Sequence, residues 1–196
     1  MKTEIKLNTP LRVDEIDFRV QSINRGGYAT ILAYKDARVD MNRLDAVYGV
    51  EGWTNTYEVI NGNLFCSISV WSDNMKQWVS KQNVGTESQA EKEKGQASDA
   101  FKRAGFCLGI GRELYDYPVI SVKLFQNEEA PKNGEWYMEG DRPKQGYGLK
   151  LKDWKWFSQF IDGKLKYLAA KDQTGKLRFS YGEYVTEEDK KNLKTA

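Results

Sequence analysis

The sequence predicts an α+β fold in which an antiparallel β-meander packs on one long helix. Two patterns support this prediction. Between residues 54 and 84, three segments alternate apolar and polar residues and are separated by turn signals, as antiparallel strands do. From residue 88 to 108, apolar residues recur at the spacing of one helix face. The 196 residues, 40% of them hydrophobic, suffice for one packed domain with an appendage.

The chain is expected to open with a strand pair and a helix. Apolar residues alternate on both sides of the turn-forming residues 24–27, so residues 16–34 are predicted to form the pair. Residues 36–48 have helical periodicity, with Asp36 as the N-cap and Gly49 as the stop. These two strands and the helix come before the meander in the sequence.

The meander is expected to contain three strands, at residues 54–60, 64–71 and 77–84. Asn61-Gly62 between the first two is a strong signal for a tight hairpin turn. Because side chains alternate along a strand, the middle strand should bury one face, made of Cys66, Ile68 and Val70.

The long helix is predicted to begin at a capping box over residues 88–91 and to end at the glycines of residues 109–111. Proline and glycine then recur through residues 126–143, which predicts a loop. We therefore expect a core over residues 1–118, a loop or linker over 119–148, and a basic aromatic region over 149–196.

The C-terminal region is strongly basic. Residues 142–181 contain ten basic and three acidic residues, a local net charge of +7 in a chain whose total is +2. Charge gathered in this way favours a polyanionic partner. Over residues 149–160, Lys150, Lys152 and Lys155 alternate with apolar residues, namely Leu149, Leu151, Trp154 and Phe157. This alternation is expected to put apolar and basic groups on different faces. A DNA surface, a partner dock and a packed part of the core all remain open here.

Most enzyme classes are excluded by the residues present. The chain has no histidine, no P-loop and no G-x-S-x-G motif, and Gly109-Ile110-Gly111 follows a helix instead of a strand. We expect no catalytic residue, no metal and no cofactor. Cys66 and Cys107 are expected to be free thiols. Without a membrane-spanning apolar run, the expected location is the cytoplasm.

A set of cations and aromatic residues predicts binding to single-stranded DNA. Lys102 and Arg103 face away from the apolar stripe of the long helix, although such a pair is more often only a solvated face. The context favours phosphate contacts and base stacking, since further cations and aromatics accompany the helices. The candidate DNA-binding residues are Lys102, Arg103, Arg38, Tyr34, Arg112, Tyr48, Lys81, Lys150, Lys152 and Lys155.

Four ordered motifs between residues 14 and 118 resemble the phage and prophage branch of the Rad fifty-two family of single-strand annealing proteins. The opening strand is similar over residues 14–21, and Arg43-Leu44-Asp45 with Gly49 and Trp53 is similar to the family's R-L-D…G…W signature. Residues 83–88 resemble its D-V-G-x-E-S motif. The most specific block comprises residues 94–104 and 109–116.

The resemblance implies a β-β-α-β-β-β-α core that assembles into a ring or helical filament. It also implies ATP-independent annealing in recombination and repair, with single-stranded DNA held in a basic groove and its bases turned outward. Lys102, Arg103, Arg38 and Tyr34 are the groove residues carried over. The homo-oligomer and single-stranded DNA are the expected partners, with an exonuclease or a single-strand-binding protein as a further candidate.

Two positions depart from the eukaryotic pattern. Phe106 stands where those members have an arginine, and Val50 stands where they have a tyrosine. The alternative function is a ring-forming scaffold that recruits a nuclease or a single-strand-binding protein and contacts DNA weakly.

Overall fold

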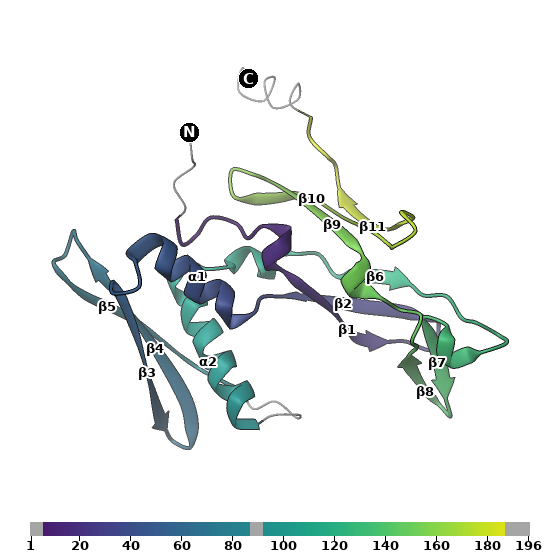
Figure 1. The fold of residues 1–196 in the computed structure, drawn as a ribbon, viewed down its shortest axis with the longest axis horizontal. Helices are drawn as coiled ribbons and strands as arrows, with labels where there is room; N and C mark the ends of the chain where they lie inside the picture. Colours follow the sequence, from purple (N-terminus) through teal and green to yellow (C-terminus); the bar gives the residue numbers. More distant parts are fainter. Residues whose placement is uncertain (1–5, 87–91, 187–196) are drawn as a thin grey trace. The chain divides into compact units, whose positions relative to one another are not determined.

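The structure is a computed structural model that describes residues 6–86 and 92–186. Within these ranges the chain is α+β, with two α-helices and antiparallel sheets (Figure 1). The predicted class is therefore confirmed. Contacts divide the chain into two compact units, the first formed by residues up to Leu11 with Lys35–Arg112, and the second by Arg12–Tyr34 with residues from Glu113 onward.

The first unit contains one sheet and both helices. Its strands are β3 (Trp53–Ile60), β4 (Asn63–Ser72) and β5 (Gln77–Val84), and its helices are α1 (Ala37–Tyr48) and α2 (Lys92–Leu108). The strands form an antiparallel meander with β4 in the centre, and both helices lie against this sheet (Figure 1). All three strands lie where the alternation predicts them.

The core of the first unit lies between β4 and the helices. Cys66, Ile68 and Val70 are buried on one face of β4, as predicted. They pack in one cluster with residues from both helices and from the turn after α2: Leu44, Ala100, Phe101, Ala104 and Ile110. Each buried aliphatic or aromatic side chain in such a core stabilises the fold by about 1.5–3 kcal/mol.

Local signals determine the ends of α1 and the first turn of the meander. The Asp36 carboxylate accepts the backbone N–H of Arg38 at 2.8 Å, and Gly49 ends the helix with φ of 76°. Asn61 and Gly62 have φ of 50° and 78°, as a type I′ hairpin turn requires. These predictions are confirmed, whereas the predicted capping box at residues 88–91 lies outside the described residues.

The signature residues of the first unit hold its pieces together. Arg43 is buried and donates to the carbonyls of Thr9 (2.8 Å) and Pro10 (3.3 Å). Asp45 accepts the indole N–H of Trp53 at 2.7 Å, which ties the end of α1 to the start of β3. The R-L-D…W motif is thus structural in this chain.

The second unit contains two three-stranded sheets and a hairpin. Its strands are β1 (Asp17–Ile23), β2 (Tyr28–Tyr34), β6 (Ile120–Lys123), β7 (Trp136–Glu139), β8 (Arg142–Gln145), β9 (Lys155–Ile161), β10 (Lys164–Lys171) and β11 (Leu177–Gly182). The sheet orders are β1-β2-β6 and β11-β10-β9, and β7 pairs with β8. The strand pair predicted at residues 16–34 is confirmed.

Residues 119–148 are not the continuous loop that their prolines and glycines predict. β6 pairs with β2, and its Ile120 and Val122 are buried in the core of the second unit. Further along, β7 and β8 form a hairpin that includes Pro143. Proline is tolerated there because each strand of a two-stranded hairpin is an edge strand. The loop prediction is therefore wrong at these strands. The partner of β6 is distant in sequence, and β7 and β8 have only four residues each, so neither gives a clear local pattern.

A buried ion-pair cluster joins the parts of the second unit. The Arg178 guanidinium donates to Glu135 (2.7 and 2.8 Å) and to Asp172 (3.1 Å). The same group lies 4.7 Å from the ring centres of Phe125 and Trp154. One cation of the +7 stretch is therefore used inside the fold and is not available to a polyanion.

Candidate nucleic-acid interface

The first turn of α1 and the middle of α2 bring Arg38 and Lys102 to one carboxylate. The Arg38 guanidinium donates to Asp36 at 2.8 Å, and its side chain is 82% exposed. The hydrogen bond from the Arg38 side chain, its backbone N–H and the nearby Lys102 charge together lower the pKa of Asp36. Two of the predicted groove residues, from different helices, therefore share one patch of the first unit.

Arg103 is held by the carboxylate one helical turn before it. Its guanidinium donates to Asp99 at 2.8 Å, and its side chain is 42% exposed. Asp99 also accepts the backbone N–H and the hydroxyl of Thr86, both at 2.9 Å. Burial raises the pKa of Asp99, but the hydrogen bonds from Thr86 and Arg103 outweigh this effect and leave the pKa lowered. Arg103 is thus oriented before any ligand arrives.

Lys81 extends this patch from the sheet. It pairs with buried Ile68 in the β4–β5 ladder, so its side chain is on the sheet face that α2 covers. Lys81 is nevertheless exposed, because β5 is the edge strand. Two residues further along, the Asn83 amide donates to the Arg103 carbonyl at 3.5 Å. We call Arg38, Lys81, Lys102 and Arg103 the helix patch.

A buried ion pair lies beneath the helix patch. The Lys35 ammonium donates to the Asp40 carboxylate and, at 3.4 Å, to the backbone carbonyl of Lys102. Lys35 and Asp40 are 4% and 0% exposed. Desolvation raises the pKa of Asp40 to about 6, although the Lys35 and Lys102 charges oppose this rise. The pair links α1, the segment before it and the backbone of α2 under the exposed cations.

Gly105 makes room for this pair. A Cβ added at Gly105 would lie 2.1 Å from the Asp40 carboxylate oxygen, so only glycine admits the close approach of α1 and α2. The sequence analysis missed Lys35 and Asp40. The available signal was Asp40 itself, which lies four residues before the core residue Leu44 and thus on the apolar face of α1.

The aromatic ring of Phe106 also contacts the buried pair. Phe106, which stands where the eukaryotic members have an arginine, has its ring centre 5.5 Å from the Lys35 ammonium.

Arg112 closes the end of α2. Its guanidinium donates to the carbonyls of Phe106 and Cys107, both at 2.7 Å. These carbonyls belong to the last turn of α2, where a cation satisfies free acceptors and opposes the helix dipole. The structure therefore gives Arg112 a capping role. A DNA contact by its remaining donors stays a prediction.

The other candidates lie elsewhere in the fold. Tyr48, the last residue of α1, is half-buried against the core of the first unit. Tyr34 ends β2 in the second unit, where the Arg19 guanidinium lies 5.5 Å from its ring centre. The remaining three lysines, which also belong to the second unit, are all exposed: Lys150, Lys152 and Lys155.

The predicted separation of apolar and basic residues over 149–160 is confirmed except at Phe157. Leu149, Leu151 and Trp154 are buried, while the lysines between them are exposed. Phe157 was expected on the apolar face but is 47% exposed, and Trp156 takes the buried position. The reason is that β9 begins at Lys155, so the strand period of two turns Trp156 inward and Phe157 outward.

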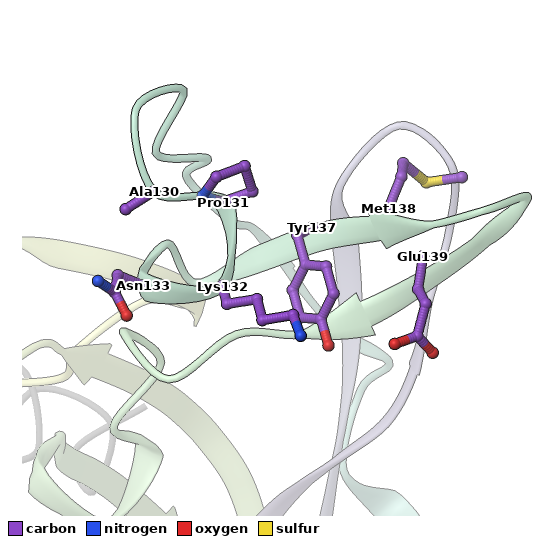
Figure 2. Close-up of a pocket in the computed structure, with 7 residues that line it drawn as sticks. All are labelled: Ala130, Pro131, Lys132, Asn133, Tyr137, Met138 and Glu139. Atoms are coloured by element: carbon purple, nitrogen blue, oxygen red, sulfur yellow. The ribbon is translucent and has the colours of Figure 1, made fainter.

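A surface hollow of about 560 Å³ lies beside β7, and Figure 2 shows the side chains that line it. It is lined by Ala130, Pro131, Lys132, Asn133, Tyr137, Met138 and Glu139. Among the described residues, no group of three or more cysteine, aspartate or glutamate side chains could hold a metal ion. No helix within residues 6–86 and 92–186 is long and apolar enough to cross a membrane.

Comparison with known proteins identifies relatives for most of the chain. Residues 2–133 match the family described as Rad52/22 family double-strand break repair proteins. The single-stranded DNA-binding protein DdrA of Deinococcus radiodurans is 31% identical over 141 residues, which are 70% of this chain and 66% of the relative. DdrA of Deinococcus deserti is 36% identical over 117 residues, 59% of this chain and 57% of the relative. The chain thus spans less than two thirds of the length of both relatives.

Proposed function

Because this chain belongs to the Rad52/22 family of double-strand break repair proteins, we propose that it binds single-stranded DNA and anneals complementary strands in recombination and repair. Both DdrA relatives are named single-stranded DNA-binding proteins, which supports the first half of the proposal. The sequence contains no P-loop, so annealing is proposed to need no ATP. Membership of the phage and prophage branch stays a prediction.

The helix patch is the observation that supports this function best. Arg38, Lys102 and Arg103 offer positive charge from two neighbouring helices, and Lys81 continues it from the sheet edge. Neutralising phosphates with such cations releases counterions, which supplies most of the affinity of sequence-independent binding. The buried Lys35–Asp40 pair fixes the two helices, so little ordering entropy is lost when DNA binds.

Annealing requires that the bound strand keep its bases accessible. Contacts through phosphates leave the Watson–Crick edges free, whereas base readout would cover them. In the Rad fifty-two arrangement that the motifs resemble, the backbone lies in a basic groove and the bases face outward. The four residues of the helix patch are all cations, which suits an arrangement in which the protein contacts the phosphates and leaves the bases accessible.

We further propose that the chain forms a homo-oligomeric ring or helical filament. The meander of the first unit ends in the edge strands β3 and β5, and edge strands favour pairing with another chain. On β3, Tyr57 and Val59 are 46% and 67% exposed, which adds apolar area to that edge. Sedimentation should give an assembly without DNA. A stable monomer at micromolar concentration would remove the basis for a ring.

The DNA-binding proposal is tested by changing Lys102→Ala and Arg103→Ala together in the full chain. Removing two phosphate contacts should lower the slope of log affinity against log salt by about 1.4 for oligo(dT), at about 0.7 per contact. The matched control is Arg25→Ala with Lys76→Ala, two exposed cations in hairpin turns. Fluorescence anisotropy at several salt concentrations measures both.

The same variants test annealing. Unlabelled complementary strands, with EDTA and without ATP, should anneal faster with the wild-type chain than without protein, and more slowly with the Lys102/Arg103 variant than with the wild type. An unchanged affinity and salt slope in a folded variant would show that the helix patch does not hold DNA. Binding without any acceleration of annealing would favour the scaffold alternative.

A further inference from the structure

We propose that the outer face of the β9–β10–β11 sheet is a second binding surface for single-stranded DNA, built around Phe157, Lys155 and Lys171. This sheet begins after residue 133, beyond the part of the chain that matches the family. The inference rests on the proposed function only for the identity of the ligand, because its residues are separate from the helix patch.

Strand register defines this face. Lys155 pairs with Lys171, and Phe157 pairs with Ala169, which in turn pairs with Ser180. Trp156, Leu168 and Ala170 alternate with these residues and are buried in the core of the second unit. Directly paired residues share a sheet face, so the lysines and Phe157 lie together on the outer side. We call this surface the Phe157 platform.

The platform suits a stacked base. Phe157 is 47% exposed, and its neighbours across the sheet, Ala169 and Ser180, have small side chains that do not rise beside the ring. An aromatic ring presented on a flat sheet stacks bases with little sequence preference, because every base has a π-face. Burying an exposed phenylalanine against a base also removes its apolar area from water.

The platform also suits a phosphate backbone. Lys155 and Lys171 are both exposed and lie directly opposite each other in the ladder, and like charges in that arrangement destabilise a sheet. In the part of the chain that the structure describes, no carboxylate lies within ion-pair distance of either lysine. The paired rows that include Phe157 contain no acidic residue. A bound polyanion would relieve this repulsion.

The chain itself covers the next part of the same face. The Gln159 side-chain amide donates to the Val185 carbonyl and accepts its N–H, both at 2.8 Å. Tyr184 lies edge-on to Tyr167 with ring centres 5.8 Å apart. Gln159 and Tyr167 are paired neighbours on β9 and β10. As far as residue 186, the segment after β11 thus covers one end of the face, while Phe157 is 47% exposed.

A surface groove adjoins the platform. It has a volume of about 520 Å³, and its lining includes Lys152, Lys155 and Phe157. Asp14 and Asp17 also line it, and Arg12 balances Asp14 with contacts of 2.9 and 3.0 Å. Because Lys152 lines the same groove as Phe157 and Lys155, a strand bound at the platform can continue toward Lys152. A protein partner is less favoured, because the platform places two lysines beside Phe157 and the cores of stable interfaces are depleted of charged residues.

The test uses the full chain and oligo(dT) carrying 5-iodouracil, with photocrosslinking and mass spectrometry of the tryptic peptide that starts at Trp156. We expect an adduct on Phe157 in the wild type and also in the Lys102→Ala/Arg103→Ala background. Phe157→Ala should remove the adduct and weaken binding by about five-fold or more, the loss of one stacked base. Phe157→Trp should preserve binding.

Charge is tested separately. Lys155→Ala with Lys171→Ala should lower the salt slope by about 1.4, whereas the matched pair Lys164→Ala and Lys166→Ala, exposed on β10 of the same sheet, should leave it unchanged. If Phe157 gives no adduct and both slopes match wild type while the Lys102/Arg103 variant still loses affinity, the platform is wrong and the proposed function stands. Loss of self-association in Phe157→Ala with intact DNA binding would assign the face to a subunit contact and overturn the inference.

Discussion

Replacing Asp36 by asparagine should tighten binding to single-stranded DNA. Asp36 has two roles, as the N-cap of α1 through the backbone N–H of Arg38 and as the counterion of the Arg38 guanidinium, both at 2.8 Å. An asparagine oxygen can accept the same backbone N–H, since asparagine and aspartate cap helices about equally well. The change therefore removes one negative charge next to the helix patch and leaves the cap in place.

The expected gain follows from counterion release. Arg38 is 82% exposed, so loss of the Asp36 charge favours a contact of its guanidinium with a phosphate. One added contact should steepen the salt slope by about 0.7, which at roughly 0.1 M monovalent salt corresponds to about five-fold tighter binding. Stability should fall only slightly, because loss of an acidic group at a helix N-terminus costs about 0.3–1 kcal/mol.

The assay is fluorescence anisotropy with oligo(dT) over a range of salt concentrations, together with thermal unfolding. Asp73→Asn is the matched control, because Asp73 lies 3.5 Å from Lys76 in the β4–β5 turn and its loss changes the net charge equally. The control should leave the slope unchanged. Equal or weaker binding by a stably folded Asp36→Asn variant, with an unchanged slope, would refute the assignment of Arg38 to the DNA surface.

Two further predictions concern the buried pair beneath the helix patch. Gly105→Ala should gain about 1 kcal/mol of helix propensity but lose about 1–3 kcal/mol to overpacking, because its Cβ would lie 2.1 Å from the Asp40 oxygen; urea unfolding that shows increased stability would contradict the packing. Asp40 has its pKa raised from 3.8 to about 6, so the folded state holds a proton that the unfolded state has lost between these pH values. The free energy of unfolding of the wild type should therefore fall, relative to that of Asp40→Asn, by up to about 3 kcal/mol as pH rises from about 4 to about 6. A difference in unfolding free energy between the two proteins that stays constant with pH would argue against this titration.

Local sequence patterns were sufficient for most elements. The N-cap at Asp36, the Asn61-Gly62 turn and the strand alternation through Cys66, Ile68 and Val70 depend on neighbours only a few residues away, so the periodicity of the chain predicts them. The same holds for the candidate cations on α1 and α2. Their contact with DNA stays a prediction, whereas the family follows from the comparison of residues 2–133.

The sequence by itself determined the α+β class, the two helices, the meander and the residues that resemble the family. Only the tertiary structure decided that β6 pairs with β2, that Lys35 and Asp40 meet beneath Lys102, and that Phe157 points outward. The physical reason is that each feature depends on contacts with residues distant in sequence, and on which side chains those contacts bury. Periodicity records which side of an element is apolar, but the partner that covers that side is set by the packing of the whole chain.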